Sequence, residues 1–556
     1  MIHPAWPDRP GYPRGGDAPL QNLETAIARV EGEFLLRESQ LAVAQGPVSI
    51  TQDLAPEAAV AAGPEPDTGP AGHPPVRTKT FLRNIGAGST VSLVKIAIQL
   101  ALLPVMAHLL GPREFGIYAL AIPVVAFLAV IADGGVGLSL ARDQTNSPVI
   151  WSTAFWVLMA SGIGLSLTVA GSGYVLALIS SEPQLKTIML ILAVSFPFLT
   201  LSVLPVARLI RSGNLVSCSI ADLISVVTSA LCAVGLGLLG FGAKSLAFQY
   251  MTGYVIRAII LNCYAFERPQ AVFRPSAIRS HLTSGGILMG GRVADLGLRF
   301  GENLLFGNAF GPATLGAYNF ANQVPRFLFE AFSNPSWSAL YAQTLGEERE
   351  RLLTLYYKVC RFMAFVTFPM AAVLAAASAD VMAQVLDPKW LEAGVFLRLL
   401  APGYAIAATA SMGTALLLAL NANKTFFATT IILGAGRVAA VASGHFLPAW
   451  QAVSLVTLSN VVFAASVFVF ARRFAGARLR AVAQDLAGPF FASVFSGVVC
   501  WSILNFTGNS IPALSAAIAT AAASYVVAMF AIDGRNLGSE LAFLKGAMGD
   551  IVKKRG

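Results

Sequence analysis

Residues 110–121 read LGPREFGIYALA, and residues 310–321 read FGPATLGAYNFA. At this offset, five positions carry the same amino acid, and the paired residues are Gly111/Gly311, Pro112/Pro312, Gly116/Gly316, Tyr118/Tyr318 and Ala121/Ala321. A Gly-Pro pair at a turn is common by itself. Five ungapped matches between apolar runs predict an internal repeat.

Apolar runs of about 20 residues continue on both sides of these blocks, and each is long enough to cross ~30 Å of hydrocarbon as a helix. We expect about fourteen transmembrane helices, over 84–109, 115–135, 150–179, 186–206, 215–240, 243–265, 283–307, 313–341, 354–377, 393–420, 424–447, 449–470, 487–506 and 511–531. Six helices separate the two copies of the repeat, so both copies enter the membrane in the same direction. This predicts two pseudo-symmetric helical lobes around a central cavity.

The composition of the 556 residues agrees with an all-α polytopic membrane protein, because 56% are hydrophobic and 12% are charged. A soluble domain has about 25% charged residues. The five cysteines and five histidines are scattered without the spacing of metal ligands or a redox pair. We therefore expect no metal, no cofactor and no nucleic-acid partner.

Lysine and arginine are concentrated in alternate connections between the expected helices. The opposite set of connections holds only Arg113, Lys186, Lys244 and Lys389. The positive-inside rule then predicts that both termini of this multi-pass protein are cytoplasmic.

The chain divides into five parts. Residues 1–80 hold 12 of the 30 prolines and are predicted to be a disordered cytoplasmic tail. Apolar residues at helical spacing over 20–41 indicate an amphipathic helix that rests on a membrane or a partner, or a transient helix in a linker. We expect an N-terminal lobe over 81–282, a C-terminal lobe over 283–480, two additional helices over 481–531 and a basic cytoplasmic tail over 532–556.

Charged residues occur inside the expected spans, where each costs roughly 2.5 kcal/mol or more when it faces lipid. The basic ones are Lys95, Arg257, Arg292, Arg299, Arg326, Arg398 and Arg437, and the acidic ones are Asp222, Asp295, Glu302 and Glu330. They should face a watery cavity or one another. Arg292, Asp295, Arg299 and Glu302 follow steps of three and four residues, so they share one face of a helix.

The candidate cavity residues share such polar faces. They are Lys95 and Gln99 on the first helix, Arg292 and Arg299 on the seventh, Asn319, Asn322, Gln323 and Arg326 on the eighth, and Arg398. Asp295, Glu302 and Glu330 are candidates for coupling sites or for neutralising pairs, such as Arg299–Glu302 and Arg326–Glu330. Lys95, Arg257, Arg398 and Arg437 have no acid nearby in the sequence, which predicts a cationic cavity. Such a cavity fits an anionic substrate, and phosphate matches arginine through charge-assisted hydrogen bonds.

Several segments together resemble the polysaccharide-biosynthesis flippases of the multidrug/oligosaccharidyl-lipid/polysaccharide exporter superfamily. They are HLLGPREFGIYALA, ADGGVGLSLAR at 132–142, FGPATLGAYNFANQV at 310–324, NPSWSALYAQ at 334–343 and DPKWLEAGVFLRLLAP at 387–402. The resemblance implies a flippase that moves a polyprenyl-diphosphate-linked oligosaccharide across the bacterial inner membrane by alternating access, for exopolysaccharide or lipopolysaccharide assembly. It further implies that Arg292, Arg299 and Arg326 contact the lipid diphosphate. Other polysaccharide-assembly membrane proteins are its candidate partners, beside membrane lipids.

Two alternatives are a transporter of the same superfamily and a membrane enzyme, which belongs to another class. A drug/cation antiporter of the same superfamily would favour carboxylates in the first lobe, whereas the first helix carries Lys95. A glycan polymerase or ligase would need catalytic groups on a large outward loop, and the longest expected one, near 378–392, has about 15 residues. We therefore expect a transporter and not an enzyme.

Overall fold

The computed structural model describes residues 78–142, 147–212, 214–344, 349–420, 422–507 and 510–553. All regular structure in these ranges is helical, which confirms the all-α prediction. The helices are α2 (Thr78–Asp133), α3 (Val136–Arg142), α4 (Pro148–Ile179), α5 (Gln184–Ala193), α6 (Ser195–Arg211), α7 (Leu215–Leu238), α8 (Ala243–Ala265), α9 (Pro275–Thr344), α10 (Arg349–Val385), η1 (Pro388–Trp390), α11 (Leu391–Ala410), α12 (Met412–Ala419), α13 (Asn423–Ala442), η2 (Ser443–His445), α14 (Ala449–Ala475), α15 (Leu479–Thr507) and α16 (Ile511–Lys553).

Ten helices within the described ranges are long and apolar enough to cross a membrane. The apolar runs form helices because a backbone in hydrocarbon must satisfy its own hydrogen bonds. The chain is therefore a multi-pass membrane protein. The ten do not include α8 or the polar helix α9, and they count α2 once although α2 is broken at Gly111. The number fourteen stays a prediction.

Both predicted repeat blocks contain a backbone break at the matching glycine. Gly111 has φ 73° and ψ 169°, and Gly311 has φ 84° and ψ 170°. Only glycine adopts this region without strain. In α9 the Asn319 side chain donates to Asn303 Oδ1 at 3.3 Å, although 16 residues of straight helix would extend about 24 Å. The two segments of α9 therefore fold back side by side as a hairpin.

The two hairpins touch through equivalent residues. A Cβ atom built on Gly116 would lie 1.6 Å from the carbonyl oxygen of Pro312, and one on Gly316 would lie 1.9 Å from that of Pro112. The backbones thus approach as closely as glycine permits. Such reciprocal contacts are expected where a two-fold axis relates two copies, and they support the predicted parallel repeat.

Aromatic residues pack together at the same end of the molecule as this contact. The buried Trp390 indole donates to the carbonyl oxygen of Ala107 at 3.1 Å. Its ring centroid lies 5.8 Å from that of Phe115 on α2 and 5.0 Å from that of Phe320 on α9. Aromatic pairs at these distances add stability beyond the area that they bury. The hairpin turns and Trp390 therefore form a packed plug between the two halves.

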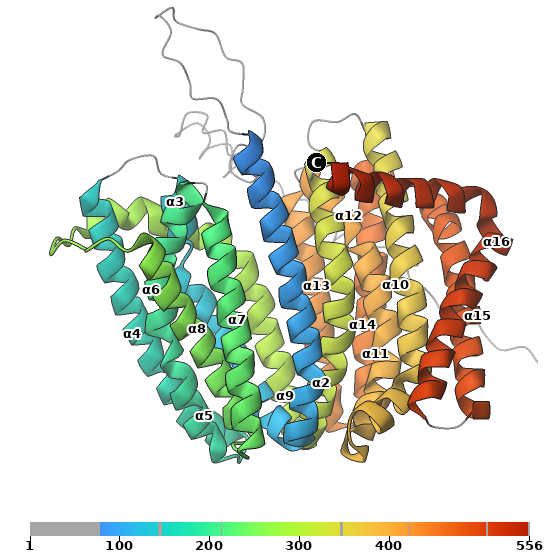
Figure 1. Cartoon of the computed structure of the whole chain (residues 1–556), viewed down its shortest axis with the longest axis horizontal. Helices are drawn as coiled ribbons and strands as arrows, with labels where there is room; N and C mark the ends of the chain where they lie inside the picture. The colour runs from blue at the N-terminus through green and yellow to red at the C-terminus, as the bar shows by residue number, and fades with distance from the viewer. Residues whose placement is uncertain are drawn as a thin grey trace, which may run out of the picture. The chain divides into compact units, whose positions relative to one another are not determined.

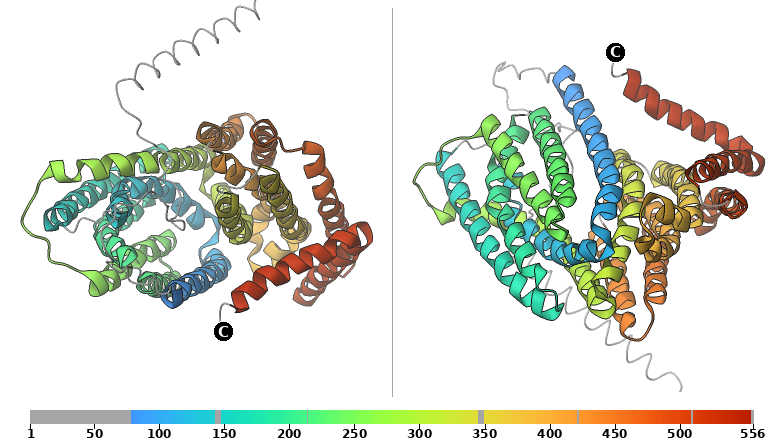
Figure 2. Two further views of the ribbon diagram at one scale, coloured as in Figure 1. Left: turned by 90° about the horizontal axis from the view of Figure 1, so that it is seen from above. Right: turned by 60° about the horizontal axis from the view of Figure 1, so that its bottom comes forward.

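The helices form two groups, and α2 lies at the boundary (Figure 1). Helices α4–α8 lie on one side and α10–α16 on the other. In both views of Figure 2, α15 and the first part of α16 lie at the outer edge of the second group. The expected tail over 1–80, including its helix over 20–41, falls outside the described residues except for the start of α2. Most of the expected basic tail over 532–556 continues α16, which ends at Lys553.

Candidate functional site

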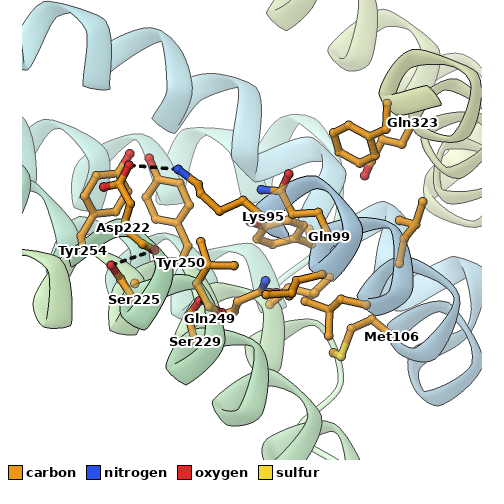
Figure 3. Close-up of a pocket in the computed structure, with 18 of the residues that line it drawn as sticks. Lys95, Gln99, Met106, Asp222, Ser225, Ser229, Gln249, Tyr250, Tyr254 and Gln323 are labelled. Carbon is orange, nitrogen blue, oxygen red and sulfur yellow. Dashed lines mark hydrogen bonds and ion pairs between the residues drawn. The ribbon is translucent and has the colours of Figure 1, made fainter. Parts of the chain in front are cut away.

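A cavity of about 520 Å³ lies between α2, α7, α8 and α9 (Figure 3). Its polar lining comes mainly from the N-terminal half and consists of Lys95, Gln99, Tyr118, Asp222, Ser225, Ser229, Gln249, Tyr250, Tyr254, Arg257 and Gln323. Three predicted cavity residues are therefore together here: Lys95, Gln99 and Gln323. Gln323 comes from α9, so the second hairpin contributes to the wall.

Helical spacing brings the lining residues of each helix to one face. On α7, Asp222, Ser225 and Ser229 follow steps of three and four residues. On α8, Tyr250, Tyr254 and Arg257 do the same. Residues at these steps lie one above another on a helix. Figure 3 shows Lys95 extending from α2 toward Asp222, with Tyr250 and Tyr254 beside that carboxylate.

The charged residues of the cavity form a triad around one carboxylate. Lys95 Nζ lies 3.0 Å from Asp222 Oδ2, and Arg257 Nε lies 2.8 Å from Asp222 Oδ1. The three side chains are 29–31% exposed, so they are accessible from the cavity. Two cations share one anion, which leaves one unit of positive charge.

A second polar cluster is buried in the C-terminal half. Arg437 on α13 donates to Glu302 at 3.0 Å, to Asn322 at 3.2 Å and to the Tyr404 hydroxyl at 3.1 Å. The Tyr318 hydroxyl also donates to Glu302. The ionic side chains are only 10% and 8% exposed. The cluster ties both segments of α9 to α11 and α13, which gives Glu302 and Asn322 a stabilising role here.

Two further pairs lie along α9 and are about 40% exposed. Arg299 Nε lies 3.0 Å from Asp295 Oδ2, and Arg326 Nε lies 2.9 Å from Glu330 Oε1. The four-residue spacing of Arg326 and Glu330 predicted this pair. Arg299 pairs with Asp295 instead of Glu302, because Glu302 is taken by Arg437.

Asn319 and Arg398, two further predicted site residues, are not among the residues that line this cavity. Asn319 bonds to Asn303 within the α9 hairpin. Arg398 is exposed on the side of α11 that also exposes Leu391 and Val395. The side chain of Arg292 falls outside the described part of the chain.

The structure pairs three cations that have no acid nearby in the sequence, namely Lys95, Arg257 and Arg437. Lys95 and Arg257 share Asp222, and Arg437 pairs with Glu302. These partners lie on other helices, so helical spacing alone could not identify them. Sequence reasoning also left Asp222 and the three cavity tyrosines out of the site. The spacing of Asp222, Ser225 and Ser229 was the available signal.

A family model described as polysaccharide biosynthesis protein matches residues 105–395, which is more than half of the chain. The chain belongs to this family. The match covers both glycine turns, at Gly111 and Gly311, and α4–α8, and it confirms the resemblance inferred from the sequence.

Two named proteins are similar in sequence over most of this chain. The succinoglycan biosynthesis transport protein ExoT of Rhizobium meliloti is 24% identical over 453 residues, which cover 79% of this chain and 90% of ExoT. The lipopolysaccharide biosynthesis protein WzxC of Escherichia coli is 20% identical over 442 residues, which cover 74% of this chain and 85% of WzxC.

Solved structures share the fold. The lipid II flippase MurJ in an inward closed conformation has a TM-score of 0.67 at 11% identity, over 81% of this chain and 99% of MurJ. An inward-facing multidrug resistance MATE family transporter of the MOP superfamily has a TM-score of 0.55 at 16% identity, over 70% of this chain and 98% of that structure. The fold of this polysaccharide biosynthesis family member is therefore that of a helical membrane transporter.

Proposed function

We propose that the protein is a flippase that moves a polyprenyl-diphosphate-linked oligosaccharide across the bacterial inner membrane by alternating access. Its product would serve exopolysaccharide or lipopolysaccharide assembly. ExoT is named as a succinoglycan biosynthesis transport protein, and WzxC is named as a lipopolysaccharide biosynthesis protein. Both names support this role.

The observation that carries the proposal is the positive charge of the cavity. Lys95 and Arg257 converge on a single carboxylate, so the cavity retains one positive charge. A diphosphate accepts charge-assisted hydrogen bonds from both cations. By contrast, the described pairs of the C-terminal half, Arg299–Asp295, Arg326–Glu330 and Arg437–Glu302, are each neutral. The diphosphate site therefore centres on the triad, with Arg299 and Arg326 as further candidates.

The rest of the cavity wall suits a glycan. Gln99, Gln249 and Gln323 supply amides, Ser225 and Ser229 supply hydroxyls, and the tyrosines supply both hydroxyls and apolar ring faces. Sugar hydroxyls lose hydration in hydrocarbon, and these groups replace part of that hydration. The polyprenyl tail stays in the bilayer.

The geometry also fits alternating access. The packed plug of Trp390 and the hairpin turns closes one end of the path between the two halves. Opening that end requires the Gly116–Gly316 contact to separate. Because this contact joins the two repeats, its separation would let each half move as a body.

A drug/cation antiporter is disfavoured by the same charge. Among the described residues that line the cavity, the acidic one is Asp222, and each of its two carboxylate oxygens contacts a cation. A cationic drug would have to displace both. We further propose that both termini are cytoplasmic, that the protein is a transporter and not an enzyme, and that it works beside other polysaccharide-assembly membrane proteins.

The test measures the accumulation of lipid-linked oligosaccharide in a strain from which the protein is deleted. A membrane-impermeant glycan-modifying enzyme distinguishes the oligosaccharide on the outer leaflet from that on the inner leaflet. Deletion should leave the intermediate on the inner leaflet. A plasmid copy of the protein should clear it, and a Lys95→Gln/Arg257→Gln copy should clear it at least about tenfold more slowly, because each charge-assisted hydrogen bond contributes about 1.5–3 kcal/mol.

The matched control is Lys186→Gln, which removes one exposed cation from α5 outside the cavity. This variant should clear the intermediate at the normal rate. Accumulation on the outer leaflet in the deletion strain would contradict flipping and indicate a later step.

A further inference from the structure

A second pocket, of about 340 Å³, lies at the ends of three helices and is separate from the cavity described above. Its wall includes the start of α4, the end of α6 and the linker 266–270 that follows α8. Because these helices begin or end here, the pocket lies where the chain leaves the hydrocarbon, at the depth of lipid headgroups. Figure 1 shows the start of α4 and the ends of α6 and α8 at the upper side of the helical bundle.

Arg208 is the fixed cation of this pocket. Its guanidinium lies over the Trp151 ring at 4.9 Å, and its Nη1 donates to the carbonyl oxygen of Ala265 at 3.2 Å. Its Nη2 lies 2.6 Å from Glu267 Oε2. The Arg208 side chain is 19% exposed, whereas that of Glu267 is 73% exposed. The arginine is thus held by the ring and the carbonyl, and its carboxylate partner is largely in solvent.

The pocket carries an excess of positive charge. Arg208 and Arg268 oppose Glu267 alone among the charged side chains of its described lining, which leaves one positive charge. The Glu267 carboxylate is largely in solvent, so a stronger anion can compete with it for Arg208. A phosphate is such an anion, because a guanidinium binds it through two parallel hydrogen bonds.

The surroundings of the pocket point to a lipid as the source of that phosphate. Trp156, Phe266 and Phe273 are 42%, 53% and 59% exposed. Phe266 lines the pocket, and the Trp156 indole donates to the carbonyl oxygen of the lining residue Gln270 at 3.1 Å. An exposed tryptophan such as Trp156 is typical of the membrane–water boundary. Basic pockets between transmembrane helices bind anionic headgroups.

We propose that this pocket binds the phosphate headgroup of an anionic phospholipid, with Arg208 as the principal ligand and Glu267 displaced on binding. The site is independent of the flippase proposal. The linker that lines it is fastened to α4, because the backbone amides of Gln270 and Arg274 donate to Ser152 Oγ and Thr153 Oγ1 at 3.0 and 3.1 Å. A bound lipid therefore contacts the connection that leads into α9.

The test uses native mass spectrometry of the full-length protein in detergent, titrated with phosphatidylglycerol, phosphatidylcholine or inorganic phosphate. We expect one phosphatidylglycerol to bind more tightly than phosphatidylcholine. Arg208→Gln should weaken its binding by about fivefold or more, since one basic side chain near a membrane surface contributes about that factor. Glu267→Gln should strengthen it, because the competing carboxylate is gone.

The matched control is Arg473→Gln, which removes an exposed arginine from the last turn of α14. It should leave phosphatidylglycerol binding unchanged. Equal losses in Arg208→Gln and Arg473→Gln would overturn the site. Unchanged or weaker binding by Glu267→Gln would overturn it as well, and this variant separates binding from a merely structural role of Arg208. Equal binding of inorganic phosphate would overturn the lipid assignment.

Discussion

Asp222 controls the distribution of charge in the cavity, because its two oxygens accept contacts from different cations. It lies 3.0 Å from Lys95 Nζ and 2.8 Å from Arg257 Nε. In the proposed function, a phosphate group competes with this carboxylate for the same donors. We therefore expect Asp222 to set both how tightly an anion binds and how readily it leaves.

Removing the charge of Asp222 should strengthen anion binding. We expect Asp222→Asn to bind inorganic pyrophosphate on the order of tenfold more tightly, since a competing charged hydrogen-bond acceptor is lost. Transport should become slower, because release is slower. Isothermal titration of the purified variant measures the affinity, and Asp295→Asn, outside the cavity lining, is the control. Weaker binding by Asp222→Asn would show that the carboxylate only organises the site.

The buried pair Arg437–Glu302 should matter for stability more than the exposed pair Arg326–Glu330. Glu302→Gln leaves a buried guanidinium without its counter-charge, at a cost of about 3–5 kcal/mol. Glu330→Gln changes a pair that is about 40% exposed, and such pairs contribute about 0–1 kcal/mol. Thermal unfolding of the purified variants compares them. Equal shifts in the unfolding midpoint would contradict the structural role of Glu302.

At the level of elements, the two hairpins are the central feature, and they depend on four glycines. Gly111 and Gly311 permit the breaks, and Gly116 and Gly316 permit the contact. A side chain at either contact position would meet a backbone carbonyl that cannot rotate away. The hairpins would have to separate.

Gly116→Ala and Gly316→Ala should therefore destabilise the protein by similar amounts, about 1–3 kcal/mol for overpacking at a close contact. Gly164→Ala on α4 is the matched control, because a Cβ atom there meets nothing within 4 Å. Thermal unfolding again provides the measurement. If only one of the two contact variants is affected, the contact is not reciprocal.

The sequence predicted the hairpins better than the site. The matching Gly-Pro pairs are local, so their positions follow from the repeat itself. The ionic partners are not local. Glu302 could be placed on a polar helix face, but its partner Arg437 is 135 residues away in the sequence. Asp222 is 127 residues from Lys95. Such pairs depend on how helices pack, which periodicity within one helix does not describe.

At the scale of the whole molecule, the start of α2 and the end of α16 lie at the same end of the helical bundle (Figure 1). We expect this end to face the cytoplasm, as the basic connections predict. Green fluorescent protein fused after Gly556 should be fluorescent, and alkaline phosphatase inserted at the turn of Gly240 between α7 and α8 should be active outside. The reverse pattern would show that the protein has the opposite orientation in the membrane.

The most direct test of the account is flipping by the purified protein in proteoliposomes that contain a lipid-linked oligosaccharide. A membrane-impermeant glycan-modifying enzyme reports how fast the inner pool reaches the outside. The wild-type protein should accelerate this exchange over protein-free vesicles, and Lys95→Gln/Arg257→Gln should lose most of the acceleration. No acceleration by the wild-type protein, or equal rates for both proteins, would contradict a cationic cavity that carries the diphosphate.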